Sequence, residues 1–362
     1  MSPEATIWPL DPHTKGKHEV LRHYLSAWFP ILASTEGRIL FIDGFAGPGE
    51  YAGGEEGSPI IALKAFLQYG TRIQAEVRFG FIEKYKDRAR HLDSLIEKLR
   101  PSLPENGHVD VLTGTFGETM SSVLDELDAQ GKTLAPAFVM IDPFGVSDTP
   151  MSVIRRVLQG DKTEVYISFM YEALNRFLTT AQFEPHLDAL FGIHDWNQAL
   201  SIVDPEERKT FLYGLYEAQL RKAGAKHVIH FEVYEEVRLV YAIFFATKHW
   251  RGADKMKHAI WKVEPSGRFA FHGTRSQQLR LGLKPDYTPL RKALQRHFRG
   301  KGWVTIERVL QFVGSDQTYF HTSQVKRPVL APMEKEKLIE VDAKSRASRK
   351  GTYPDHTRLR FL

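Results

Sequence analysis

An acid followed directly by a glycine-rich turn is the strongest indication of a ligand site in this sequence. Asp43 lies in the apolar run 38–45, and the turn beyond it has the spacing Gly-x-x-Gly-x-Gly. This differs from the Gly-x-Gly-x-x-Gly of dinucleotide sites. Glycines let the backbone approach a ligand closely, so we predict that the turn holds the amino-acid part of S-adenosylmethionine. A plain tight turn is the alternative. The residues predicted to bind are Asp43, Gly44, Phe45, Ala46, Gly47 and Gly49.

Two further strand ends carry groups suited to the rest of such a cofactor. Glu83 ends the run FGFIE, where a carboxylate can accept both hydroxyls of a ribose. Thr115 and Phe116 follow the next strand, where they could border an adenine ring. The alternatives are a surface acid pairing with a neighbouring lysine, and a turn with a core phenylalanine.

The run Asp142-Pro143-Phe144-Gly145 follows a fourth apolar strand. Methyl transfer to an exocyclic amine needs an acceptor that orients the nitrogen and a ring that stacks on the base. We predict that Asp142, through its carboxylate or the following carbonyl, orients the amine and that Phe144 stacks on the base. A Pro-Gly turn with a buried phenylalanine is the alternative.

Lys17 and His18 precede an amphipathic stretch at 20–28. Their positive charge could neutralise a cofactor carboxylate or nucleic-acid phosphates, or could simply be solvated. We predict contact with nucleic acid.

Other chemistries are excluded or disfavoured by what the sequence lacks. There is no cysteine, which excludes disulfides, thiolate ligands and a cysteine nucleophile. No His-Glu-x-x-His, Walker loop or Gly-x-Ser-x-Gly elbow occurs, and we predict no metal site. A phosphate enzyme with Asp43, Glu83 and Asp142 as metal ligands is an unfavoured alternative, because no nearby histidine or acid completes a two-metal set.

Strands alternate with helical stretches along the first part of the chain, which indicates βαβ units and a parallel sheet. Five parallel strands and a closing hairpin match a Rossmann-like class I methyltransferase sheet. The predicted strands are 38–45, 77–83, 108–114, 137–142, 164–170, 227–234 and 238–247. We assign residues 1–282 to this domain, with a helical insertion at about 172–224.

Positive charge is concentrated in the last part of the chain. Residues 285–362 hold 16 Lys and Arg against 8 Asp and Glu, whereas the rest is close to neutral. We predict that residues 283–362 form a basic winged helix-turn-helix that contacts phosphates. A third helix would start at about Pro328. The predicted contacts are Lys344, Arg346, Arg349 and Lys350.

The combination of motifs resembles the three-Cys-motif partner protein family. The matching text includes Lys17-His18, the turn 42–51, Gly57-Ser58-Pro59, the run 141–145 and Met256-Lys257. The match covers nearly the whole chain. The family's cysteines belong to its partner, so the resemblance implies a cysteine-bearing partner protein.

Two enzyme families share parts of this text. The glycine-rich turn with Gly57-Ser58-Pro59 resembles ribosomal RNA adenine methyltransferases of the YhiR type, which implies that Lys17 or His18 lies near the cofactor or target. The Asp142–Gly145 run is similar to that of tRNA guanine-N2 dimethyltransferases. It departs from the Asp-Pro-Pro-Tyr of adenine enzymes, which puts adenine as the target in doubt.

We therefore predict an S-adenosylmethionine-dependent methyltransferase that acts on an exocyclic base nitrogen of RNA or DNA. The alternative is a non-catalytic adaptor that binds nucleic acid and the cysteine-motif partner. No stretch is apolar enough to span a bilayer and no secretory signal is evident, so we expect a cytoplasmic protein without membrane contact.

Overall fold

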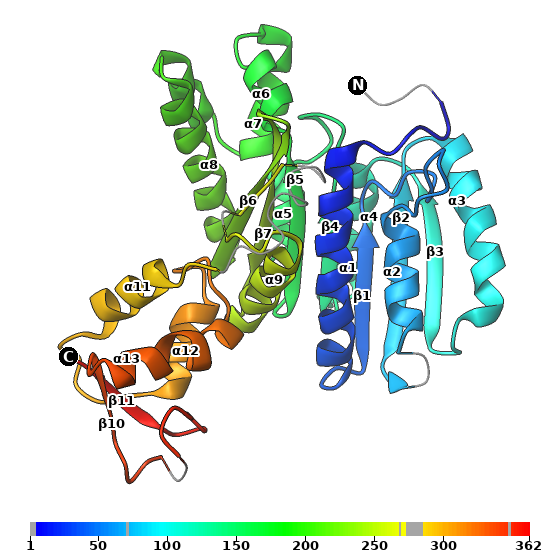
Figure 1. Ribbon diagram of the computed structural model, residues 1–362. Helices are drawn as coiled ribbons and strands as arrows, with labels where there is room; N and C mark the ends of the chain where they lie inside the picture. The colour runs from blue at the N-terminus through cyan, green and yellow to red at the C-terminus, as the bar shows by residue number, and fades with distance from the viewer. Residues whose placement is uncertain (1–4, 70–71, 268, 273–284, 347–348) are drawn as a thin grey trace.

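The computed structural model describes residues 5–69, 72–267, 269–272, 285–346 and 349–362. Its main sheet is built from β1 (Arg38–Asp43), β2 (Glu76–Glu83), β3 (Gly107–Thr113), β4 (Ala137–Ile141), β5 (Thr163–Phe169), β6 (His227–Glu235), β7 (Arg238–Thr247) and β8 (Ala270–Phe271). The strand order is β3-β2-β1-β4-β5-β7-β6-β8 (Figure 1). Strands β1 to β5 are parallel, and β7 enters antiparallel between β5 and β6. This confirms the predicted Rossmann-like class I methyltransferase sheet.

Helices cover both faces of the sheet because successive residues of its buried strands point to opposite sides. Phe41 of β1 packs into one apolar cluster and its neighbour Ile42 into the other. The Phe41 face is covered by α1 (Pro12–Ala33), α2 (Ser58–Leu67), α3 (Lys86–Leu99) and α9 (Trp250–Val263). The Ile42 face is covered by α4 (Phe116–Ala129), α5 (Met151–Val157), α7 (Glu184–Phe191) and α8 (Pro205–Lys222).

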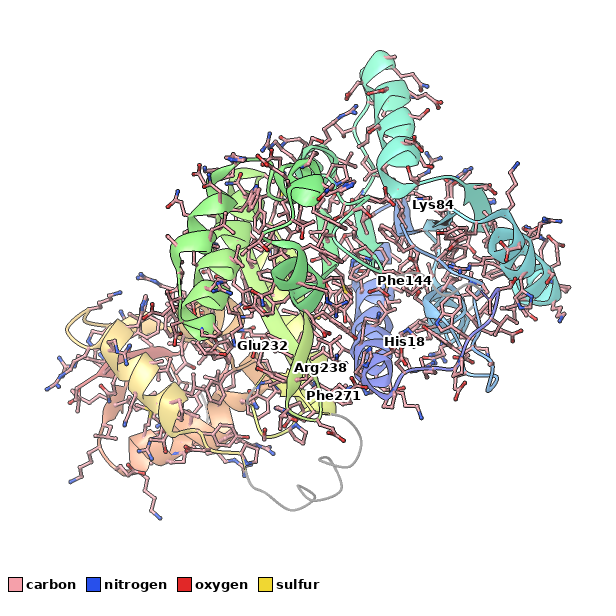
Figure 2. The ribbon with its side chains drawn as sticks, turned by 90° about the horizontal axis from the view of Figure 1, so that it is seen from above. His18, Lys84, Phe144, Glu232, Arg238 and Phe271 are labelled. Atoms are coloured by element: carbon pink, nitrogen blue, oxygen red, sulfur yellow. The ribbon has the colours of Figure 1, made fainter. Side chains whose placement is uncertain are left out.

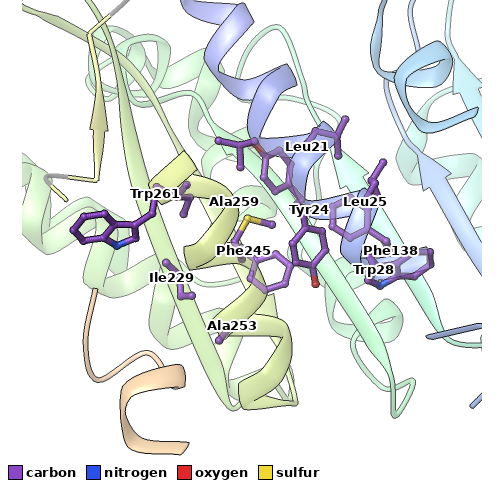
Figure 3. Packing of buried hydrophobic residues seen from close by; sticks show 14 of the residues in the cluster. Leu21, Tyr24, Leu25, Trp28, Phe138, Ile229, Phe245, Ala253, Ala259 and Trp261 are labelled. Atoms are coloured by element: carbon purple, nitrogen blue, oxygen red, sulfur yellow. The ribbon is translucent and has the colours of Figure 1, made fainter. Parts of the chain in front are cut away.

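The first helix is held by aromatic packing against the middle of the sheet (Figure 3). Tyr24 lies 5.4 Å from Phe138 of β4 and 5.3 Å from Phe245 of β7, measured between ring centroids. The Tyr24 hydroxyl also donates to Glu164 at 2.5 Å. The predicted amphipathic stretch 20–28 is thus the buried middle of a longer helix, which begins at Pro12 and carries Lys17 in its second turn.

The insertion predicted at 172–224 is helical but broken into short pieces. It contains α6 (Tyr171–Phe177), a 3₁₀ turn at Ala181–Phe183, α7, a second 3₁₀ turn at Asp195–Ser201, and α8. Gly192 ends α7 in a left-handed conformation, with φ of 69°. The sequence analysis did not identify α9 or β8.

The C-terminal region consists of α11 (Thr288–Phe298), β9 (Val304–Thr305), α12 (Ile306–Gly314), α13 (Ala331–Lys335), β10 (Ile339–Val341) and β11 (Arg358–Phe361). Its three strands pair in the order β10-β11-β9. The helix predicted to start near Pro328 starts at Lys326, as a π turn at Lys326–Leu330 that continues directly into the short α13. A 3₁₀ turn at Thr322–Gln324 precedes it. Prolines 328 and 332 lack the N–H that a regular helix would use. The winged-helix interpretation stays a prediction, and the predicted boundary at 282/283 lies outside the described residues.

The C-terminal region docks near the amino-terminal ends of the parallel strands, at the bottom of Figure 1. The buried Lys257 of α9 donates to the carbonyls of Val313, Ser315 and Thr318. Asp316 accepts from Arg221 of α8 and from the backbone N–H of Val228. Polar contacts therefore fix this region to the main sheet. None of the described helices is both long and apolar enough to cross a membrane.

Candidate active site at the carboxyl edge of the sheet

Two adjoining cavities open at the carboxyl ends of the parallel strands. The outer cavity, of about 390 Å³, is lined by residues that follow β1, β2, β3 and β4 and by residues of α6. The inner cavity, of about 160 Å³, lies between the glycine-rich turn and the start of α1. Phe45, Pro143 and Phe144 line both cavities. Ligands of open α/β sheets bind at this edge.

The glycine-rich turn forms a wall of the inner cavity through Ala46, Gly47 and Gly49. Gly47 and Gly49 have φ of 63° and 87°, a conformation that side chains disfavour. A Cβ on Gly44 would lie 2.4 Å from the ring of Phe116. The spacing of these glycines therefore reflects a tight turn packed under an aromatic ring, with its backbone facing the cavity.

Asp43 lies beneath this turn and is fully buried. Its Oδ1 accepts the backbone N–H of Phe45 at 3.1 Å, whereas Oδ2 has no hydrogen-bond partner. Burial raises the pKa of Asp43 to about 6. Asp43 is not among the residues that line the two cavities, so the backbone of the turn, rather than this carboxylate, faces the space directly.

Glu83 lines the outer cavity and is 5% exposed. Its Oε2 accepts the N–H of Gly47 at 2.9 Å, and its Oε1 accepts the N–H of Tyr85 at 2.7 Å. Burial raises its pKa. Since each carboxylate oxygen has two lone pairs, both oxygens keep an acceptor site for a ligand. The alternative considered for Glu83 was an ion pair with a neighbouring lysine, but Lys84 contacts Asp148 instead.

Thr115 and Phe116 also line the outer cavity. The Thr115 hydroxyl caps α4 by accepting the N–H of Glu118, and it donates to the Glu118 carboxylate at 2.7 Å. The Phe116 ring is 1% exposed and packs near Phe45. The core phenylalanine considered as the alternative is thus present, and Thr115 and Phe116 also border the cavity. Contact with an adenine ring stays a prediction.

Asp142 and Lys17 form an ion pair at the floor of the inner cavity. Lys17 Nζ lies 2.5 Å from Asp142 Oδ2, and the two side chains are 6% and 25% exposed. Burial would raise the pKa of Asp142, but the Lys17 ammonium outweighs it and holds that pKa below its usual range. The geometry therefore argues against a phosphate contact by Lys17, because its charge is already buried against a carboxylate.

The side chains of Lys17 and His18 line different cavities. His18 is 5% exposed, and burial lowers its pKa to about 3, so it is neutral at pH 7. It lines a different surface hollow together with Lys15, Arg22 and Phe271. This argues against the predicted phosphate contact, because a neutral buried imidazole offers a polyanion no charge.

Phe144 is an exposed ring of the site, with 41% of its surface accessible, and Tyr85 of the outer cavity is 42% exposed. Trp8 lies edge-on to Phe144, with 5.7 Å between ring centroids, and the N–H of Ala52 donates to the Trp8 carbonyl. The N-terminal segment thus runs over the carboxyl edge, at the top of Figure 1. Sequence reasoning missed Trp8, because no spacing links it to the strand ends.

Tyr241 of β7 is a second residue that the sequence did not single out. Its ring lines the inner cavity and lies 5.5 Å from Lys17 Nζ. Its hydroxyl is buried without a hydrogen-bond partner. Buried polar atoms are nearly always paired, so an unpaired one in a cavity indicates a group that a ligand or water satisfies.

The four basic residues predicted to contact phosphate differ in accessibility. Lys344, Arg349 and Lys350 are exposed. Arg346 is 9% exposed, and its Nη1 lies 2.7 Å and 2.9 Å from the two oxygens of Glu334. Its environment is therefore that of a structural ion pair, which argues against a phosphate contact.

The acids considered as metal ligands do not form a cluster among the described residues. Glu83 is held by amides and Asp142 by Lys17, as described above. Among the described residues, the possible metal-ligand atoms of Glu184, Asp188 and His194 lie within 4.8 Å of one another, on the surface of the insertion. Asp188 there accepts from the indole N–H of Trp196 at 2.7 Å.

Comparisons with known proteins return structures but no sequence family. No protein-family model matches the chain, and no curated protein matches it. Trm1 from Pyrococcus horikoshii, solved with S-adenosyl-L-methionine, is 10% identical with a TM-score of 0.39, covering 77% of each chain. An O-methyltransferase from Bacillus cereus, solved with SAH, is 13% identical with a TM-score of 0.35, covering 63% of this chain and 80% of that one. These scores are too low to carry an argument about activity.

Proposed function

We propose that the chain is an S-adenosylmethionine-dependent methyltransferase. The observation that carries this proposal is the convergence of four strand ends on one cavity. Gly44 and Phe45 follow β1, Glu83 ends β2, Thr115 and Phe116 follow β3, and Pro143 and Phe144 follow β4, and all line the outer cavity. Such convergence at the carboxyl edge is the general way an open α/β sheet binds a nucleotide-like ligand.

The residues present fit the cofactor. Glu83 keeps acceptor sites for two ribose hydroxyls, and Thr115 and Phe116 border the space for the adenine ring. The turn backbone at Gly47 and Gly49 and the Tyr241 hydroxyl offer polar groups to the amino-acid end. When bound, the cofactor would supply a methyl group on a sulfonium. This chain's part is to hold it and to orient the acceptor toward the methyl group.

Binding of S-adenosylhomocysteine, measured by calorimetry, tests the cofactor site. We expect micromolar binding by the wild type and at least tenfold weaker binding by Glu83→Ala, which removes both ribose acceptors. Asp43→Ala should also weaken binding, because it frees the glycine-rich turn. Glu97→Ala is a matched control on the exposed face of α3, with no expected effect. A folded wild type that binds no S-adenosylhomocysteine would contradict the proposal.

We further propose that the acceptor is an exocyclic base nitrogen of RNA or DNA. Phe144 is exposed at the junction of the two cavities, where a flipped base could stack on it. The carboxylate oxygen of Asp142 that does not contact Lys17, or the carbonyl after it, could accept an amine hydrogen. The amine loses its proton after transfer, so no strong base is needed. Methyl transfer from labelled cofactor to mixed RNA and DNA should fall at least 100-fold in Asp142→Asn.

A non-catalytic adaptor is the second candidate, and the position of the C-terminal region favours it. The exposed basic residues Lys344, Arg349 and Lys350 belong to the segment between β10 and β11. These two strands lie at the bottom of Figure 1, away from the carboxyl edge of the sheet. An adaptor would bind nucleic acid with steep salt dependence but show no methyl transfer, alone or with a cysteine-motif partner. The three-Cys-motif partner resemblance and a cytoplasmic location belong to this proposal as well.

A further inference from the structure

The insertion completes the outer cavity with side chains that the cofactor site does not use. Ala173, Arg176 and Phe177 of α6 line it together with Phe183 of the following 3₁₀ turn. The groups suited to adenosine lie instead at the ends of β2 and β3. The cavity therefore has a second part, bounded by the insertion and by the segment 143–148.

Two rings of the insertion form a fixed aromatic wall in this second part. Phe177 and Phe183 stack face to face, with centroids 4.0 Å apart and planes 6° apart. Stacking on Phe183 holds the Phe177 ring in place before any ligand arrives. Phe144, which lines the same cavity from the end of β4, is 41% exposed. Aromatic residues from two distant segments of the chain thus line one space.

Two cations lie at the rim of this space. Arg176 pairs with Glu172 at 3.3 Å and Lys84 pairs with Asp148 at 3.3 Å, and the two basic side chains are 64% and 53% exposed. Exposed pairs at this distance contribute about 0–1 kcal/mol, so either cation can turn toward a stronger anion such as a phosphate. Figure 2, which looks down on the carboxyl edge, shows Lys84 and Phe144 on the same side of the molecule.

From this arrangement we propose that the insertion forms an acceptor subsite, in which a nucleotide base stacks between Phe144 and Phe177 and its phosphate lies against Arg176 and Lys84. Aromatic walls beside a cationic rim are the combination that binds single-stranded nucleotides. The subsite rests on the proposed function, and it narrows the acceptor to an unpaired or flipped nucleotide.

A trinucleotide with 2-aminopurine at its centre tests the subsite directly, because stacking on an aromatic ring quenches its fluorescence. The probe is titrated into full-length protein saturated with S-adenosylhomocysteine. We expect quenching by the wild type, and loss of most of it with roughly tenfold weaker binding in Phe177→Ala. Arg176→Gln should keep the quenching at saturation but weaken binding severalfold and lower the salt dependence.

The matched control is Arg100→Gln. Arg100 also lies in an exposed ion pair with an acid one turn away, Glu97, but near the end of α3 distant from the cavity. It should change neither quenching nor affinity. S-adenosylhomocysteine affinity, measured by calorimetry, should stay within twofold of wild type in all three variants.

Three outcomes separate failure of the subsite from failure of the proposed function. If Phe177→Ala binds the probe like the wild type, the subsite is wrong while the cofactor site stands. If Phe177→Ala instead loses S-adenosylhomocysteine binding, the insertion is a wall of the cofactor site and the subsite is again wrong. If the wild type binds no S-adenosylhomocysteine, the proposed function fails and the subsite fails with it.

Discussion

The two ends of the main sheet differ in the surroundings of their buried polar groups. At the amino-terminal end, Lys257 donates to three carbonyls, and Asp254 accepts both the N–H and the hydroxyl of Thr322. At the carboxyl end, Asp43 Oδ2 and the Tyr241 hydroxyl are buried without partners. Unpaired buried groups cost stability and occur at both ends, since the Thr163 hydroxyl at the start of β5 is also buried without a partner. The Tyr241 hydroxyl differs in that its residue lines a cavity, where a ligand or water can satisfy it. The amino-terminal end thus carries the paired docking contacts, and the carboxyl end carries the candidate binding site.

The largest expected effect comes from breaking the ion pair at the carboxyl end. Asp142→Asn leaves the buried Lys17 ammonium without its counter-charge, which should lower the free energy of unfolding by about 3–5 kcal/mol. Urea denaturation would measure this loss. The double variant Lys17→Met/Asp142→Leu removes both charges and should recover most of the stability but no methyl transfer. If the single variant is as stable as wild type, the pair is not buried as described.

At the amino-terminal end, the matched change is Lys257→Met. It removes a donor from the carbonyls of Val313, Ser315 and Thr318, of which Val313 keeps the Thr318 hydroxyl. Each buried group left unsatisfied costs about 1–3 kcal/mol. We expect a lower unfolding midpoint in thermal denaturation. S-adenosylhomocysteine affinity should not change, because no cavity residue is touched. A large loss of affinity would show that the two ends are coupled and would break the comparison.

Titration of Asp43 should contribute to the pH dependence of the free energy of unfolding. Its folded-state pKa is about 6, above the usual aspartate value of 3.8, so the folded chain keeps a proton that the unfolded chain releases between these values. The stability from this proton is complete below pH 3.8 and is lost as pH rises through 6, by about 1.4 kcal/mol per pH unit at most. Urea denaturation at pH 5 and pH 7 should therefore show a smaller difference in Asp43→Asn than in the wild type.

The smallest expected effects come from removing one hydroxyl at each end of the sheet, and the two removals should act in opposite directions on stability. Tyr241→Phe removes an unpaired hydroxyl, so stability should hold or rise slightly, while S-adenosylhomocysteine affinity should fall severalfold if the cofactor satisfies that hydroxyl. Thr318→Val, at the other end, removes a hydroxyl that donates to the Val313 carbonyl at 2.9 Å and should instead lower stability by about 1 kcal/mol. Thermal denaturation and calorimetry on both variants would show whether the effects are opposite.

The fold was predictable because local signals agree with it. An acid ends β1 and β2 and directly follows β4, and two residues, Glu236 and Val237, join β6 to β7. These strand ends and the hairpin could therefore be placed from periodicity and turn residues alone. The convergence of Gly44, Glu83, Phe116 and Phe144 follows from that sheet, since parallel strands end at one edge.

The rest of the site depends on contacts between distant parts of the chain. Nothing near Lys17 indicates that its partner lies 125 residues later. The sequence analysis therefore predicted that Lys17 contacts nucleic acid. Arg346 was assigned to phosphate on composition, although Glu334, twelve residues earlier, neutralises it. Charge counts show how much charge a region carries, but burial and pairing decide which of it reaches a ligand.

The first helix has a consequence for the way the chain is made. Helix α1 packs on α2, which is near it in sequence, but other parts of its buried face meet partners that are synthesised much later. Tyr24 must meet Glu164 and Lys17 must meet Asp142, across separations of 140 and 125 residues. Closing such long loops is slow, so α1 should remain incompletely docked until β5 has been synthesised. A translation pause before β5 would then leave its aromatic face exposed to chaperones.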